Sequence, residues 1–165
     1  MLATLNDVLL PARRDGYAVG LFNTVNLEMA LGVLQAAEAL RSPVIIGTAE
    51  VLLPYGPLRP LVDLLLPMAQ RASVPVVLHY DYGLTFENCM LALQYGFSSV
   101  MYDCSTCAYE ENLLRVRELA RIAHAMGATL EAELGHVGNA EGGAEETHEA
   151  ETDPLALYTD PAQAV

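Results

Sequence analysis

Polar and acidic side chains stand at or just beyond the ends of several short apolar segments. The clearest case is the stretch VVLHYDYG, in which His79 and Asp81 follow a run of valines and a leucine. Asn23, Asp103 and Glu133 occupy comparable places at the ends of other segments. Carboxylates that converge at one place support acid–base chemistry or metal binding. These positions predict an active site if the fold brings them together.

Short strands that alternate with helices would position these residues. The predicted strands are 18–22, 44–47, 76–80, 99–103 and 129–134, and most of them are apolar on both faces. That composition is typical of a parallel sheet covered by helices. The alternation predicts either a doubly wound sheet or part of a (β/α)8 barrel, and in both folds active sites lie beyond the carboxyl ends of the strands.

Cap residues mark the helices between these strands. Thr4 and Asp7 form a capping-box pair, and Asn26 and Thr85 are expected to cap the helices that follow them. Gly96 has the place of a C-terminal cap. The clearest helix is 109–125, with acidic residues in its first turn and arginines further along, which complements the helix dipole.

The alternation of side chains along a strand sorts the residues of VVLHYDYG. Val77, His79 and Asp81 should share one face, and Tyr80 and Tyr82 the other. The histidine and the aspartate would then point to the same side of the sheet.

Composition excludes several classes of function. The net charge of −13 and the pI near 4.4 disfavour nucleic acid and anionic membranes as partners. All eight basic residues are arginines, so this chain has no lysine for a Schiff base, for PLP attachment or for a phosphate-binding P-loop. No apolar run approaches the ~20 residues of a membrane span and no signal peptide is visible, so we expect a reduced, cytoplasmic protein.

Three cysteines offer a weaker alternative. Cys104 and Cys107 form a CxxC pair that could bind a soft metal or act in redox chemistry. No second CxxC is present, and Cys89 lies in an apolar helical segment. We interpret all three as ordinary thiols and keep the redox hypothesis as an alternative.

The C-terminal part of the chain changes character. Residues 135–153 are rich in glycine and glutamate and predict an acidic mobile loop, either simply solvated or acting as a lid. The final YTDPAQAV has the signals of a helix start, and the chain ends within about one turn. We therefore expect that the chain is cut short.

Several motifs together resemble one enzyme family. FNTVNLEMALGVLQAAEALRSPVIIG, VPVVLHYDYG, SSVMYDCS, EENLLRVRELARIAHAMGATLEAELG and LYTDPAQAV occur in the order found in the class II ketose-bisphosphate aldolases. The resemblance implies a (β/α)8 barrel of ~250 residues or more, of which this chain would supply about the first five β/α units as one domain, 1–165. It also implies that three further strands lie downstream.

The resemblance assigns roles to individual residues. In this family zinc polarises the ketose carbonyl and stabilises the enediolate that forms on carbon–carbon cleavage. Asp81 matches the aspartate that handles the proton of the hydroxyl that becomes the aldehyde, and Glu141 matches a loop glutamate that exchanges the proton of the enediolate. Asn23 matches a residue of the substrate pocket. Asp103 and Glu133 match carboxylates of an alternative metal position.

One departure from the family pattern concerns the metal. Tyr82 stands where the family has its first zinc-binding histidine, and the other two histidines lie in the later strands. Phenols, with a pKa of about 10, are poor zinc ligands at neutral pH. We therefore expect that this chain alone is inactive, and keep a non-catalytic relic or interaction module as the alternative. The resemblance implies a small phosphorylated sugar, fructose- or tagatose-bisphosphate, as substrate and is compatible with a homo-oligomer.

Overall fold

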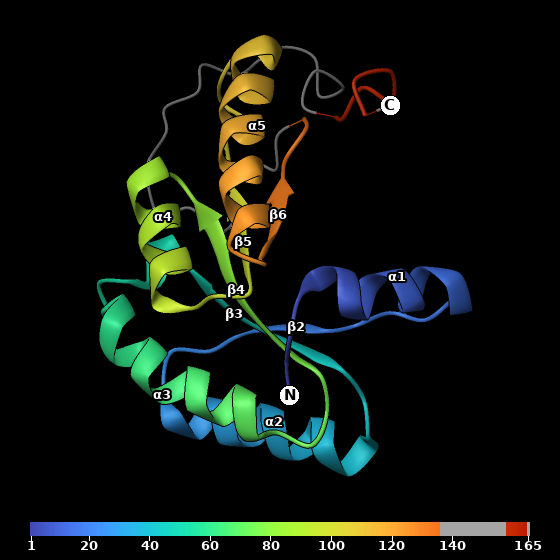
Figure 1. The fold of residues 1–165 in the computed structure, drawn as a ribbon, viewed down its shortest axis with the longest axis vertical. Helices are drawn as coiled ribbons and strands as arrows, with labels where there is room; N and C mark the ends of the chain where they lie inside the picture. The colour runs from blue at the N-terminus through green and yellow to red at the C-terminus, as the bar shows by residue number, and fades with distance from the viewer. Residues whose placement is uncertain (136–157, 165) are drawn as a thin grey trace.

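Strands and helices alternate along the whole described part of the chain. The structure, a computed structural model, describes residues 1–135 and 158–164. The elements, shown in Figure 1, are β1 (Leu2–Ala3), α1 (Leu5–Asp15), β2 (Leu21–Asn23), α2 (Leu27–Leu40), β3 (Val44–Ala49), a 3-10 turn (Glu50–Leu52), α3 (Leu58–Arg71), β4 (Val76–Gly83), α4 (Phe86–Tyr95), β5 (Ser99–Tyr102), α5 (Tyr109–Ala125) and β6 (Thr129–Ala132).

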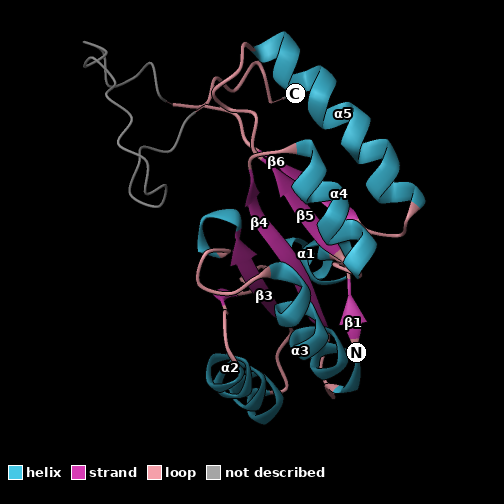
Figure 2. Cartoon of the chain, turned by 90° about the vertical axis from the view of Figure 1, so that its left-hand side faces the viewer, coloured by secondary structure: helices cyan, strands magenta, loops and turns pink. Residues whose placement is uncertain are grey.

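One parallel sheet organises these elements. Its order is β2-β3-β4-β5-β6, and β1 pairs with the start of β4, where Leu2 lies opposite Val76. Further along β4, His79 lies opposite Ser99 of β5. From β2 to β6 successive strands are neighbours, and all strand pairs are parallel. The strands therefore point the same way, and their carboxyl ends meet at one edge (Figure 2).

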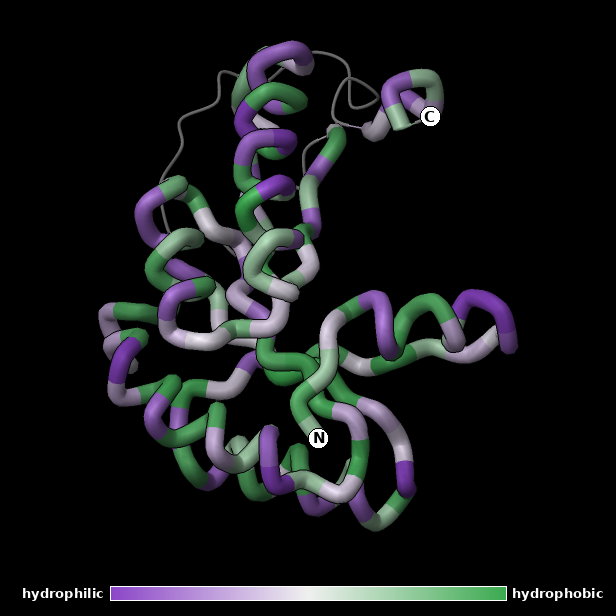
Figure 3. Tube along the Cα trace, viewed as in Figure 1, coloured by the Kyte–Doolittle hydropathy of each residue, from purple (hydrophilic) through white to green (hydrophobic). Residues whose placement is uncertain are grey.

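The two faces of the sheet have different partners. Helices α2 to α5 pack on one face, around a core that includes Leu34, Leu65 and Leu119. The opposite face, here called the inner face, contacts α1 through Ile45 and Val77. Figure 3 shows hydrophobic residues along the central strands and an alternation of hydrophobic and hydrophilic residues along the helices. This is the pattern of helices that bury one side only.

Local signals in the sequence predicted most element boundaries. Thr4 and Asp7 form the capping box of α1, and Asn26 and Thr85 cap α2 and α4 through side-chain hydrogen bonds. Gly96 ends α4 in the left-handed conformation, at φ 100°. The cap geometry explains this agreement, because each of these side chains or conformations satisfies backbone groups that the helix leaves unpaired.

Strand lengths differ from the expectation. β3 and β4 extend beyond the predicted 44–47 and 76–80, and β2 begins three residues later than predicted. The two-residue β1 was not anticipated, because two residues carry no periodicity. Its pairing is supported by the terminal amine of Met1, which donates to the carbonyl of Val74 at 2.9 Å.

The ends of the sheet are open within the described residues. β2 and β6 terminate the strand order, and Leu21 and Phe22 of β2 are 39% and 50% exposed. A groove of about 360 Å³ lies beside β2 and is lined in part by Phe22, Val33 and Leu40. Such exposed apolar side chains are what a partial barrel should show at its edge.

The C-terminal part is only partly described. Of the expected loop 135–153, only Gly135 falls within the described residues. Residues 158–164 include a turn in which Asp160 Oδ1 accepts from the N–H of Ala162 at 2.9 Å, as at the start of a helix. Across the described residues, no helix combines the length and the apolar character needed to cross a membrane.

Candidate active site

Strand β4 carries the candidate acid–base residues. Its first residues are β-branched or aliphatic and wholly buried, which suits the centre of a parallel sheet. His79 and Asp81 follow Val77 at two-residue intervals, so they lie on the inner face, away from α2 to α5. The sequence prediction that these two side chains share a face agrees with the contact between them.

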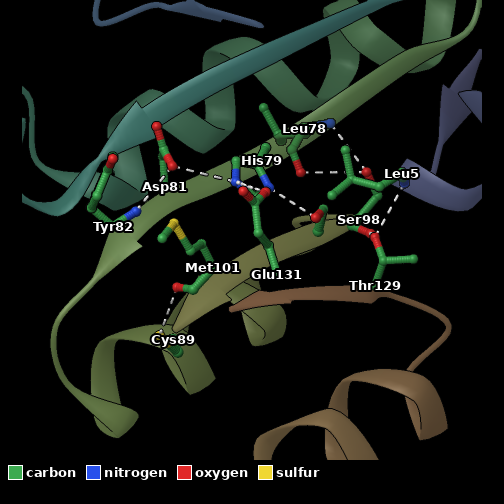
Figure 4. A network of polar contacts seen from close by, with 11 residues as sticks. Leu5, Leu78, His79, Asp81, Tyr82, Cys89, Ser98, Met101, Thr129 and Glu131 are labelled. Carbon is green, nitrogen blue, oxygen red and sulfur yellow. Dashed lines mark hydrogen bonds and ion pairs between the residues drawn. The ribbon is translucent and has the colours of Figure 1, made fainter. Parts of the chain in front are cut away.

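His79 lies between three polar side chains, one from its own strand and one each from β5 and β6. It is completely buried, and its Nδ1 is 2.8 Å from Ser99 Oγ of β5. Its Nε2 is 3.6 Å from Asp81 Oδ1 and 3.5 Å from Glu131 Oε2 of β6 (Figure 4). The sequence analysis placed His79 on the same face as Asp81 without a specific role, and it did not single out Ser99. The H-x-D spacing was the signal that could have assigned His79, because it places both side chains on one face.

Asp81 combines burial with access from one side. The residue is 8% exposed, and its Oδ1 accepts from the backbone N–H of Tyr82 at 3.2 Å. A carboxylate that is mostly shielded from water, yet reachable at the end of a strand, is well placed to exchange a proton with a bound ligand.

The backbone is irregular directly after Asp81. Tyr82 has φ 45°, which is uncommon for a residue with a side chain, and the pairing register between β4 and β5 shifts between Tyr80 and Gly83. The bulge interrupts the strict alternation that predicted opposite faces for Asp81 and Tyr82. Strained backbone of this kind concentrates at functional sites.

Gly83 allows β4 to pass close to its neighbours. A Cβ atom at this position would lie 2.4 Å from Cys89 Sγ and 2.6 Å from the carbonyl oxygen of Met101. No side chain fits there without displacing backbone, so glycine is required by close approach rather than by its φ angle.

Glu50 does not join the inner face. The sequence places it just beyond β3, but its carboxylate accepts from Tyr80 Oη at 3.0 Å, from the N–H of Leu84 at 2.9 Å and from Asn88 Nδ2 at 2.8 Å. These contacts tie β3 to β4 and α4 on the helix side. Burial, together with the nearby Glu50 carboxylate, raises the pKa of the Tyr80 phenol, which keeps it a donor.

The other predicted site residues occupy separate places. Asn23 is exposed on β2. Asp103 Oδ1 accepts from the N–H of Ser105 at 2.9 Å, which shapes the turn after β5. Glu133 follows β6, and its backbone carbonyl accepts from Asn112 Nδ2 at 2.9 Å. Glu141 lies outside the described residues.

The described residues do not make a zinc site. Within 1–135 and 158–164, no three His, Cys, Asp or Glu side chains are arranged to hold a metal ion. In the cluster on the inner face, His79 Nε2 already occupies the space between the two carboxylates. Tyr82, which the sequence resemblance predicts at a zinc-ligand position, has a phenol, and a phenol is a weak zinc donor at neutral pH.

Two of the three cysteines, Cys89 and Cys104, lie in environments that disfavour thiolate chemistry. Burial raises the pKa of the Cys89 thiol to about 12, and it also raises the pKa of Cys104. The N–H of Cys107 donates to the carbonyl of Cys104 at 2.9 Å, as in an ordinary turn. A reactive cysteine needs a lowered pKa, so this geometry gives the redox hypothesis no support.

Comparison with known proteins places this geometry in a family. The chain matches the family described as fructose-bisphosphate aldolase class-II over residues 3–165. A fructose-bisphosphate aldolase of Thermus caldophilus is 42% identical over 164 residues, which are 99% of this chain and 52% of that protein.

Solved structures agree with the family match. The crystal structure of the YdjI aldolase from Escherichia coli K12 aligns with a TM-score of 0.84 at 38% identity, covering 99% of this chain and 59% of that one. A structure described as a putative fructose-1,6-biphosphate aldolase from Coccidioides immitis aligns with a TM-score of 0.75 at 34% identity, covering 83% of this chain and 48% of that one.

The extent of these matches explains the open sheet. The chain spans about half the length of the curated relatives it matches. Its strands and helices form part of the (β/α)8 barrel of those aldolases, with β2 and β6 at the open edges. By its sequence match and its fold, the chain belongs to the class II fructose-bisphosphate aldolase family.

Proposed function

We propose that the protein carrying this chain is a lyase that reversibly cleaves a ketose 1,6-bisphosphate, with Asp81 as the residue that moves the proton of the cleavage step. The products would be dihydroxyacetone phosphate and glyceraldehyde 3-phosphate. The observation that carries the proposal is the position of Asp81, nearly buried at the end of β4 and backed by His79. Relatives named fructose-bisphosphate aldolase support the substrate class.

The chemistry asked of Asp81 is a single proton transfer. Its carboxylate would take the proton from the hydroxyl on the carbon that becomes the aldehyde. The oxygen electrons then form the new carbonyl, and the electrons of the breaking carbon–carbon bond pass to the ketose side as an enediolate. In this proposal Glu141 protonates the enediolate carbon, and Asn23 lines the substrate pocket. A positioned general base typically contributes about 10²- to 10⁴-fold.

The test is a coupled assay of fructose- and tagatose-bisphosphate cleavage with Asp81→Asn. This variant keeps the shape of the side chain and removes its basicity. We expect cleavage to fall at least about 100-fold, with unchanged folding by circular dichroism. Asp63→Asn makes the same chemical change at an exposed carboxylate on α3, away from β4, and is the matched control. Equal cleavage by Asp81→Asn and wild type would rule out the assigned role.

Zinc dependence is a separate part of the proposal. Zinc, when bound, would polarise the ketose carbonyl, and the described residues do not by themselves form its site. Asp103 and Glu133 would offer an alternative metal position only together with residues outside the described range. We propose that the 165-residue chain on its own binds zinc below stoichiometry and does not turn over.

A non-catalytic relic or interaction module is the second candidate, and Tyr82 is the observation that favours it. Metal analysis and the cleavage assay, run on the protein that carries this chain with and without Tyr82→His, separate the two. Stoichiometric zinc with turnover in the unmodified chain would contradict the relic hypothesis. If the protein carrying this chain cleaves no substrate, either as wild type or as Tyr82→His, the relic hypothesis is favoured.

The remaining assignments complete the proposal. We propose that residues 1–165 belong to a single domain and that 135–153 forms a lid over a small phosphorylated sugar. A cytoplasmic location and a homo-oligomer are proposed on the same family grounds, and neither nucleic acid nor membrane is a proposed partner. Size-exclusion chromatography with light scattering tests the oligomer directly.

A further inference from the structure

His79 has an unusual environment for a fully buried side chain. One ring nitrogen, Nδ1, contacts Ser99 Oγ at 2.8 Å. The other, Nε2, is buried and has no hydrogen-bond partner among the described residues. Its nearest acceptors, Asp81 Oδ1 at 3.6 Å and Glu131 Oε2 at 3.5 Å, lie just beyond hydrogen-bond distance. Buried polar atoms are nearly always paired, so this one calls for an explanation.

The two carboxylates determine where the ring carries a proton. Ionised carboxylate oxygens only accept hydrogen bonds. A lone pair on Nε2, pointed between Asp81 and Glu131, would be repelled by both groups. Nε2 therefore carries a hydrogen in the neutral ring and in the charged ring alike. Ser99 fits both cases, because its hydroxyl can donate to Nδ1 or accept from it.

The distances favour neither carboxylate as the acceptor of the hydrogen on Nε2. They differ by 0.1 Å, and the two oxygens come from different strands, β4 and β6. Glu131 Oε2 belongs to a side chain that is 47% exposed, whereas the Asp81 side chain is 12% exposed. A displacement of about 0.5 Å would bring either oxygen within hydrogen-bond distance of Nε2.

We propose that His79 is a positioning residue that holds Asp81 through an Nε2–H shared with Glu131. When Asp81 turns toward a substrate hydroxyl, the Nε2–H group donates its hydrogen bond to Glu131 instead of Asp81. The ring therefore always has an acceptor. Ser99 anchors the other side of the ring and fixes its plane. The catalytic half of this inference rests on the proposed function of Asp81. The shared contact itself does not, because it is a property of the folded chain.

The shared contact can be tested without any turnover. Nitrogen-15 labelling of the histidines reports which ring nitrogen is protonated, and the chain has four histidines, so the His79→Gln spectrum assigns the signal. We expect a protonated Nε2 whose signal shifts both in Asp81→Asn and in Glu131→Gln. A neutral ring protonated on Nδ1 alone would overturn the proposal. A response to only one of the two substitutions, or to neither, would also overturn it.

A matched pair of substitutions tests the positioning role. The amide of glutamine reaches the place of Nε2, whereas the amide of asparagine reaches only the place of Nδ1. In the protein that carries this chain, we expect His79→Asn to lower kcat for cleavage about 10- to 100-fold with little change in KM, as for other residues that orient a catalytic group. His79→Gln should restore kcat to within about threefold of wild type.

The outcomes separate this inference from the proposed function. Equal kcat values for the two variants, each normalised to its folded fraction from urea unfolding, would overturn the positioning role. If wild type does not cleave the sugar bisphosphates, the proposed function fails. The nitrogen-15 spectra then still decide whether His79 holds Asp81.

Discussion

Glu50 should be a structural residue although it stands at the end of a strand, and Glu50→Ala tests this. The carboxylate accepts hydrogen bonds from Tyr80, Leu84 and Asn88 at 2.8–3.0 Å. Removing it leaves the hydroxyl of Tyr80, a fully buried residue, without its acceptor. The other two donors lie closer to solvent, where water can replace the lost oxygen.

The expected loss follows from these differences in burial. A hydrogen bond to a charged group typically contributes about 1.5–3 kcal/mol, and a partly solvated one about 0.5 kcal/mol. We therefore expect Glu50→Ala to lower the free energy of unfolding by about 2–4 kcal/mol. Glu50→Gln keeps one oxygen for Tyr80 and Leu84 and should lose only about 1 kcal/mol.

The assay is urea unfolding of the two single variants, of Tyr80→Phe and of the double variant. Tyr80→Phe removes the stranded hydroxyl, so Glu50→Ala should be milder in that background by about 1–2 kcal/mol. Strict additivity, or a loss below about 0.5 kcal/mol for Glu50→Ala, would show that the carboxylate does not hold these strands together.

Two further predictions concern backbone and pH. Gly83→Ala should lower the free energy of unfolding by about 1–3 kcal/mol, because the Cβ of the alanine would clash with Cys89 Sγ and the Met101 carbonyl oxygen. Gly32→Ala, in open space within α2, should instead stabilise by about 0.5–1 kcal/mol, and urea unfolding that ranks the two alike would refute the packing argument. Hydrogen bonds at the start of α1 lower the pKa of Asp7 below 3.8, so its stabilisation is present above that pH and is lost as pH falls through the folded pKa. The stability gap between wild type and Asp7→Asn should shrink on acidification, and a constant gap in urea titrations at several pH values would contradict this.

Local chemistry made much of the fold predictable from sequence. Thr4, Asn26 and Thr85 mark helix starts because each supplies an oxygen to an unpaired N–H. The apolar runs of β3 and β4 indicated buried parallel strands. They are buried because α2 to α5 cover one face of the sheet and α1 contacts the other. β1 depends on long-range pairing with β4, which no local pattern records.

The site was predictable only in part. Period-two alternation placed His79 and Asp81 together, whereas a positive φ at Tyr82 and a register shift between β4 and β5 make the backbone irregular directly after them. Glu50 also stands at the end of a strand, yet its three donors lie on the helix side. Which way a side chain turns beyond the last paired residue depends on tertiary contacts, and the sequence does not display these.

The central claim, that Asp81 moves the proton of the cleavage step, is tested most directly by comparing two partial reactions in the protein that carries this chain. One is cleavage of the ketose bisphosphate, and the other is exchange of a carbon-bound proton of dihydroxyacetone phosphate with solvent, followed by NMR in deuterium oxide. Because Asp81 acts on the hydroxyl of the aldehyde half, Asp81→Asn should reduce cleavage at least about 100-fold and leave proton exchange within about threefold of wild type. Equal losses in both reactions, or a loss in neither, would contradict the account.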